Sequence, residues 1–171
     1  GVMHFYTKRP KLGDSASHVA VNVFSRYSSA NNESTSHIDL NYGLKKVAFL
    51  SSITYSTFDD LRGGFFKNPF IDSLWDCRYY VETINGNDTM IRNTNKRVQR
   101  FSGYKQTDFM QKILFAQNDR VTHTMNFQYS ISSDVPRYDR LQQWSGTTLR
   151  FAEWKYGPQK RVLGSYALNI R

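Results

Sequence analysis

The sequence predicts an all-β protein, folded as an antiparallel meander of about six strands. Apolar and polar side chains alternate with a period of two along several segments, which is typical of strands whose two faces meet different surroundings. β-Branched and aromatic residues dominate these segments. No stretch of about twelve residues carries uninterrupted apolar positions at helical spacing, so a helical fold fits the sequence worse than an all-β fold.

The predicted strands differ in the clarity of this alternation. They span residues 18–28, 35–44, 47–57, 103–116, 121–131 and 160–171. Phe127 and Ile38 belong to apolar rows, whereas Thr124 belongs to a polar row on the opposite face of its strand. The segment 103–116 is ambiguous because it carries apolar residues on both faces. The polar stretch 28–36 is predicted as a loop, and no internal repeat is found.

Short turns alternate with long connections along the predicted meander. The turns at 45–46 and 117–120 are short, whereas the connections 58–102 and 132–159 are long. Transmembrane β-barrels are built this way, from strands of about ten residues with short turns on one rim and long loops on the other. A soluble antiparallel sandwich with one wet face stays open, because a period of two does not separate a lipid-facing row from a core-facing row.

The membrane alternative gains support from what the sequence lacks. A soluble sheet of this size buries its apolar row under a second layer, and the chain offers no spare apolar element for that role. About eight strands are needed to close a barrel, so a membrane interpretation implies that the chain is an excerpt of a longer protein. The first residue, Gly1 instead of Met, fits a processed chain or an excerpt.

Composition limits the remaining classes of function. The 171 residues include 23 Lys+Arg against 14 Asp+Glu, and the net charge of +9 suits an anionic partner. The basic residues are scattered in pairs such as Lys45-Lys46, which disfavours nucleic acid. A soluble all-β module that binds an anionic polymer such as single-stranded nucleic acid is the alternative function. The single Cys77 excludes an internal disulfide, and no run of about 18 apolar residues predicts a spanning helix.

Three stretches of the sequence resemble a known family of membrane proteins. The start, residues 1–10 (GVMHFYTKRP), resembles the segment where the plug ends and the barrel begins in TonB-dependent outer-membrane receptors. Residues 54–64 (TYSTFDDLRGG) resemble a third barrel strand that runs into an extracellular loop in the Bacteroidetes members of that family. The most specific matches lie in residues 126–141 and 152–161 (AEWKYGPQKR), so the three matches span nearly the whole chain in family order.

The resemblance implies a receptor whose amino-terminal plug sits inside a transmembrane β-barrel of about 22 strands. Residues 1–12 would be the end of the plug and its connection to the barrel. Residues 13–171 would be the amino-terminal part of the barrel, an incomplete arc that supplies wall and extracellular loops. The expected location is the outer membrane of a Gram-negative cell, with its lipid as a partner.

The same resemblance implies transport without chemistry on the ligand. Such a receptor imports a scarce small-molecule nutrient, for example an iron-siderophore complex, haem or cobalamin. TonB is the expected partner that drives import, through a plug segment that this chain lacks. No enzymatic activity, no cofactor and no nucleic-acid partner are expected. A barrel of another family, such as a simple porin, stays open.

Candidate ligand contacts are aromatic residues of the two long loops. Exposed aromatic side chains commonly anchor recognition, and a planar chelate or haem would stack on them. The five candidates are Phe65, Phe66, Trp75, Tyr138 and Trp144. Tyr27, Tyr55 and Tyr129 lie at predicted strand ends and are instead expected in the aromatic girdle of a barrel.

A charged run in the second long loop has a predicted structural role. Arg137, Asp139 and Arg140 follow Pro136, and we expect them to tie the loop back onto a strand through arginine–carboxylate pairs. The histidines are far apart in the sequence and form no metal-binding motif; they are His4, His18, His37 and His123. Neither a catalytic site nor a metal site is therefore predicted.

Overall fold

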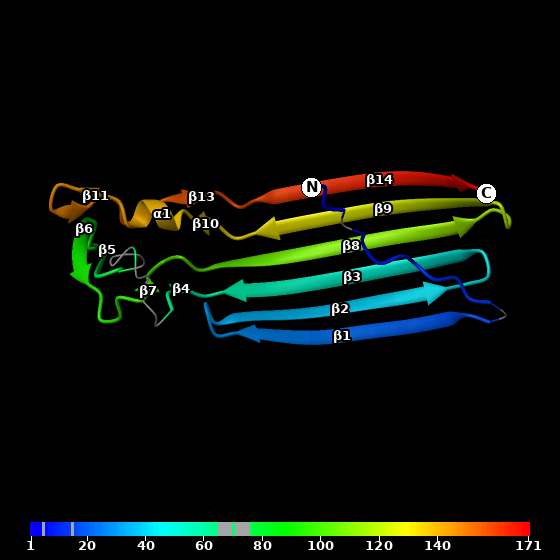
Figure 1. Cartoon of the computed structure of the whole chain (residues 1–171), viewed down its shortest axis with the longest axis horizontal. Coiled ribbons are helices and arrows are strands. Elements are labelled where there is room, and N and C mark those ends of the chain that lie inside the picture. The colour runs from blue at the N-terminus through cyan, green and yellow to red at the C-terminus, as the bar shows by residue number, and fades with distance from the viewer. Residues whose placement is uncertain (5, 15, 65–69, 71–75) are drawn as a thin grey trace.

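The computed structural model describes residues 1–4, 6–14, 16–64, 70 and 76–171. Its main element is a six-stranded antiparallel sheet in the order β1-β2-β3-β8-β9-β14 (Figure 1). These strands are β1 (His18–Ser28), β2 (Glu33–Gly43), β3 (Val47–Phe58), β8 (Tyr104–Ala116), β9 (Val121–Ser132) and β14 (Lys160–Ile170). The all-β, antiparallel prediction is confirmed, and each predicted strand end lies within two residues of the observed one.

The register of the strands places their apolar rows on one face of the sheet. Val23 of β1 is opposite Ile38 of β2, and Ile38 is opposite Ile53 of β3. The same line continues through Phe109 of β8 to Tyr129 of β9. Because consecutive residues of a strand point to opposite sides, the polar rows share the other face. We call these two sides the apolar face and the polar face.

Side chains on the apolar face remain exposed. Val23, Ile38 and Phe127 have 71%, 44% and 45% of their surface accessible. The other exposed apolar side chains of this face are Val19, Val21, Tyr27, Leu40, Tyr42, Ile53, Tyr55, Phe109, Phe115, Met125, Val162, Tyr166, Leu168 and Ile170. The second layer that a soluble sandwich requires is thus absent from the described residues.

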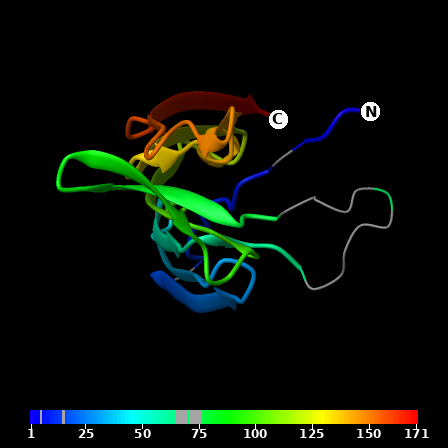
Figure 2. The ribbon, with the colours of Figure 1, turned by 90° about the vertical axis from the view of Figure 1, so that its left-hand side faces the viewer.

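The polar face carries the amino-terminal segment, which crosses the sheet and lies on its concave side (Figures 1 and 2). The backbone N–H of Lys11 donates to Asn41 Oδ1 at 2.8 Å, and Asn41 Nδ2 donates back to the Lys11 carbonyl at 3.0 Å. Lys112 Nζ donates to the Lys8 carbonyl at 2.8 Å. Leu50 lies between Asn41 and Lys112 in the register and is fully buried.

The predicted loop over 28–36 is wrong in extent. Glu33 to Ser36 pair with Ser25 to Ser28, so the turn between β1 and β2 contains only residues 29–32. Asn32 closes this turn with a left-handed φ of 47°, which asparagine tolerates better than most residues. The polar composition reflects the end of a paired strand, because backbone pairing does not require apolar side chains.

The two long connections lie at one end of the sheet and contain short elements that the sequence analysis did not predict (Figure 1). These are the pairs β4 (Leu61–Arg62) with β7 (Val98–Gln99), β5 (Tyr79–Ile84) with β6 (Asn87–Arg92), β10 (Val135–Pro136) with β13 (Lys155–Tyr156), β11 (Trp144–Ser145) with β12 (Thr148–Leu149), and helix α1 (Tyr138–Leu141). No helix in the described ranges has the length and apolar character needed to cross a membrane.

Candidate functional site

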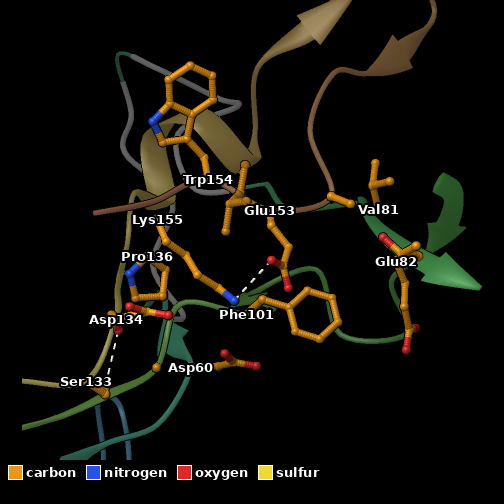
Figure 3. Close-up of a pocket in the computed structure, with 14 residues that line it drawn as sticks. Asp60, Val81, Glu82, Phe101, Ser133, Asp134, Pro136, Glu153, Trp154 and Lys155 are labelled. Carbon is orange, nitrogen blue, oxygen red and sulfur yellow. Dashed lines mark hydrogen bonds and ion pairs between the residues drawn. The ribbon is translucent and has the colours of Figure 1, made fainter. Parts of the chain in front are cut away.

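The two long connections enclose a pocket of about 590 Å³ at the loop end of the sheet (Figure 3). The first connection contributes Asp60, Val81, Glu82, Thr83, Phe101 and Gly103. The second contributes Ser133, Asp134, Pro136, Leu141, Ala152, Glu153, Trp154 and Lys155. Because both connections line it, the pocket exists only when they are folded against each other.

The floor of the pocket is apolar. Val81, Leu141 and Ala152 line it and are buried. Val81 and Ala152 also belong to a small hydrophobic cluster with Leu149, against which Tyr79 packs. This cluster holds the β5 strand against the second connection. Pockets of about 300–1,000 Å³ with apolar floors are the usual sites of small-molecule binding.

Phe101 lines the pocket with an unusual backbone conformation. Its φ is +64°, a left-handed conformation that costs a bulky residue roughly 1–2 kcal/mol. The ring is 42% exposed and meets the edge of Tyr80 at a centroid distance of 5.7 Å. The Arg100 guanidinium lies 6.0 Å from the centre of the Phe101 ring. Such strain persists only where surrounding contacts impose it.

Those contacts join the two ends of the first long connection. Asp60 Oδ1 accepts a hydrogen bond of 2.9 Å from the backbone N–H of Ser102. Ser102 Oγ accepts from the backbone N–H of Leu61 at 2.7 Å and donates to the Gln99 carbonyl at 2.7 Å. Ser102 is buried, so these bonds fix the residue that follows Phe101. They set the position of the aromatic ring.

The charged side chains of the pocket are mainly acidic. Four carboxylates, from Asp60, Glu82, Asp134 and Glu153, line it together with one ammonium group, from Lys155. Lys155 Nζ lies 3.1 Å from Glu153 Oε2, and the Arg100 guanidinium lies 3.6 Å from Asp60 Oδ2. The local charge of the pocket is therefore opposite to the positive charge of the whole chain.

The aromatic residues predicted as ligand contacts do not meet in this pocket. Tyr138 and Trp144 are about half exposed and line a neighbouring hollow of about 540 Å³, together with Cys77. Trp144 packs its edge against Tyr79 at 6.0 Å. Phe65, Phe66 and Trp75 lie outside the described residues. Of the predicted set, the structure brings together only Tyr138 and Trp144.

The predicted charged run lies at the start of α1. Arg137 Nε donates to Asp139 Oδ1 at 3.0 Å, and this carboxylate holds the pKa of the Arg137 guanidinium above its usual value. The backbone N–H of Arg137 donates to the Trp154 carbonyl at 2.8 Å. The Arg140 guanidinium lies 5.8 Å from the ring of Trp154. These contacts attach α1 to the segment that contains Trp154.

The described residues show no metal-binding cluster, and their one cysteine is unreactive. No group of three or more His, Cys, Asp or Glu side chains within the described ranges is placed to hold a metal ion. Cys77 is buried, and this burial raises the pKa of its thiol to about 11. The thiol is therefore protonated at neutral pH, which makes it a poor nucleophile. The geometry supports reversible binding of a ligand.

Sequence reasoning missed Phe101, Trp154 and Glu82 as pocket residues. The Asn85-Gly86 pair is a hairpin signal in the sequence. In the structure these two residues have positive φ values of 51° and 82°, as a type I′ turn requires. That signal predicts β5 and β6 and hence places Glu82 on a strand. No comparable signal marks Phe101 or Trp154, whose positions depend on contacts between the two connections.

The fold and the site define an all-β, antiparallel six-stranded sheet that carries a ligand-sized pocket between two long loops. No protein-family model, no curated protein and no solved structure matches the chain. The distribution of polar and apolar side chains over the two faces of the sheet is the structural feature that bears most directly on function.

Proposed function

We propose that this chain is part of the wall of an outer-membrane receptor of the TonB-dependent kind, with extracellular loops that bind a scarce nutrient. One observation carries the proposal: the sheet is polar where the chain covers it and apolar where the chain leaves it open. In a water-soluble protein this distribution is reversed, because burying apolar surface is the main driving force of folding.

The covered face supports a barrel interior. Asp39, Asn41 and Lys112 are charged or amide side chains, yet each has 6% or less of its surface exposed beneath the amino-terminal segment. Lys8 Nζ donates to Asp39 Oδ1, in addition to the bonds that Asn41 and Lys112 make. A plug segment resting on the polar lumen wall of a barrel would make contacts of this kind.

The open face supports contact with lipid. The six strands contain 11 to 13 residues each. At about 3.4 Å per residue and a tilt of about 45°, such strands span roughly 26–31 Å, close to the thickness of the hydrocarbon core. Tyr27 and Tyr55 lie toward the loop end of the open face, and Tyr42 and Tyr166 toward the turn end, as in an aromatic girdle.

The loop end then faces the outside of the cell and carries the pocket. Import of a bound nutrient, of the iron-siderophore, haem or cobalamin type, would be driven by TonB acting on a plug segment. The chain itself would contribute binding and barrel wall and no chemical step. Residues 1–12 would be the end of the plug, and the six strands would be an arc of a barrel of about 22 strands.

The full-length gene product, expressed in a Gram-negative host, tests the proposal. We expect it in the outer-membrane fraction, and we expect unboiled protein to migrate faster on a denaturing gel than boiled protein, as folded barrels do. The matched control is the same protein boiled before loading. A monodisperse monomer in detergent-free buffer, seen by light scattering, would contradict the proposal, because an uncovered apolar face associates in water.

A further inference from the structure

We infer that the pocket between the two long loops binds an organic cation, an ammonium or guanidinium group carried on an apolar body. This inference rests on the proposed function and specifies its ligand class. The shape of the pocket, its charge and a second, oppositely charged hollow beside it support this ligand class.

The shape of the pocket suits an apolar body of small-molecule size. Its floor consists of Val81, Leu141 and Ala152, and the ring of Phe101 stands at its wall (Figure 3). The Phe101 ring is 42% exposed and lies outside the hydrophobic cluster of Val81, Leu149 and Ala152. Aromatic rings in such a position offer a rigid apolar contact surface at a low cost in conformational entropy.

The charge of the pocket specifies the ligand's polar group. Glu153 already has Lys155 as its partner, and Asp60 has Arg100. Within the described part of the chain, no ion pair involves the carboxylates of Glu82 or Asp134. Glu82 and Asp134 are exposed, so a ligand cation would meet these two carboxylates at the rim of the pocket, whereas an anion would meet repulsion.

An adjacent hollow shows what an anion site on these loops would look like. It has a volume of about 430 Å³ and is lined by Arg62, Arg92 and Arg100 together with Asp59 and Asp60. Asp60 lines both hollows and pairs with Arg100 of the second one. The three arginines therefore line the adjacent hollow, whereas the pocket with the apolar floor is acidic. A ligand with an apolar body would bind in the acidic pocket.

A matched set of three fluorescent probes tests the inference on the full-length protein in detergent. Dansylcadaverine carries an ammonium group, dansylamide is neutral and dansylglycine carries a carboxylate, and all three share one apolar ring system. We expect dansylcadaverine to bind about tenfold more tightly than dansylamide, which corresponds to about 1.4 kcal/mol. Dansylglycine is expected to bind more weakly than dansylamide.

Two variants locate the effect. Glu82→Gln with Asp134→Asn should abolish the preference for dansylcadaverine and leave the affinity for dansylamide unchanged. Phe101→Ala should weaken both probes by a similar factor. The control, Asp14→Asn with Asp119→Asn, changes the net charge equally at two exposed positions far from the pocket and should keep the preference.

Equal or tighter binding of dansylglycine would overturn the inference, as would a preference that survives in the Glu82→Gln, Asp134→Asn variant. Heat-modifiable migration, recorded on the same preparations, separates this result from a failure of the proposed function. If the protein is a folded membrane protein that prefers dansylglycine, the inference of a cationic ligand is wrong and the proposed receptor function stands. If the protein is instead a soluble monomer, the three probes test the pocket on that monomer with the same expected and contrary outcomes.

Discussion

Lys112 Nζ donates a hydrogen bond of 2.8 Å to the backbone carbonyl of Lys8, so a buried ammonium group of β8 holds the amino-terminal segment against the sheet. The same ammonium group donates to the carbonyl and to the hydroxyl of Thr7. All of these acceptors belong to the crossing segment and none to the sheet. The role of Lys112 is therefore to attach one part of the chain to another.

Lys112→Met should release that segment. The substitution leaves the Thr7 and Lys8 carbonyl oxygens without their donor, at a cost of about 1–3 kcal/mol. We expect trypsin to cleave after Lys8 and Lys11 at least about fivefold faster in the purified full-length variant. Lys105→Met is the control, because Lys105 is exposed on the same strand. Equal cleavage rates in the two variants would show that Lys112 does not hold the segment.

Gly43→Ala should displace the same segment by steric overlap. A Cβ atom at Gly43 would lie 2.2 Å from the Lys11 carbonyl oxygen, far inside a normal contact. Overpacking of this kind costs about 1–3 kcal/mol, and the trypsin assay reports it as faster cleavage after Lys11. At Gly164 a Cβ atom would meet nothing within 4 Å, so Gly164→Ala should behave like the parent protein. If both variants are cleaved at the parent rate, the close approach of the Lys11 carbonyl to Gly43 is contradicted.

The assignment of the two faces predicts opposite responses to a new charge. Phe127→Arg, on the apolar face, should impair membrane insertion by about 2–4 kcal/mol if the residue lies near the bilayer midplane. Thr124→Arg, on the polar face of the same strand, should be mild. The measurement is the folded fraction in lipid vesicles across a urea titration. Equal tolerance of the two arginines would refute the assignment.

We expect Asp59 to make the loop end of the sheet sensitive to pH. The backbone N–H of Asp60 and the Asn32 amide donate to its carboxylate at 2.8 and 3.2 Å, and they hold its pKa below 3.8. The stabilisation is present above pH 3.8 and is lost as the pH falls through the lower, folded-state pKa. Amide hydrogen exchange in residues 29–34 should accelerate over that range. Asp59→Asn should remove the response, and an unchanged response in that variant would assign it to another group.

Cys77 should resist alkylation in the folded protein. Its thiol is buried and its pKa is raised to about 11, so the reactive thiolate is scarce at pH 8. Iodoacetamide should modify the denatured chain at least tenfold faster than the folded chain. A tenfold ratio corresponds to about 1.4 kcal/mol of protection. Rapid modification under native conditions would show that the loop around Cys77 opens readily.

The strands of the sheet were predictable because their signal is local. Alternation along β9 fixes which side Phe127 and Thr124 occupy before any partner strand is known. The ambiguity over residues 103–116 has a physical reason, because β8 carries Lys112 and Leu114 on the covered face and apolar side chains on the open one. The apolar Met110 and Leu114 share the covered face with Lys112, and they break the simple pattern.

The pocket was not predictable in the same way. Phe101 gains its position from the bonds of Ser102 to Asp60 and Leu61, which are about 40 residues earlier in the chain. Tyr138 and Trp144 were sound candidates as exposed aromatic side chains, yet the fold of α1 and β11 directs them to a different hollow. Contacts between loops, with no periodic pattern behind them, decide which aromatic residues share a cavity.

The bonds of Ser102 also bear on the order in which the sheet assembles. The β2–β3 turn contains residues 44–46, whereas β3 and β8 are separated by residues 59–103. Closing the longer connection costs about 2.4 kcal/mol more in chain entropy, so β1-β2-β3 and β8-β9 are expected to form first as separate hairpin units. Asp60, Ser102 and the stacked rings of Phe58 and Tyr104, 4.5 Å apart, lie where these units join. This junction adjoins the pocket, which Asp60 lines, so a substitution that slows the joining of the two units is also expected to weaken ligand binding.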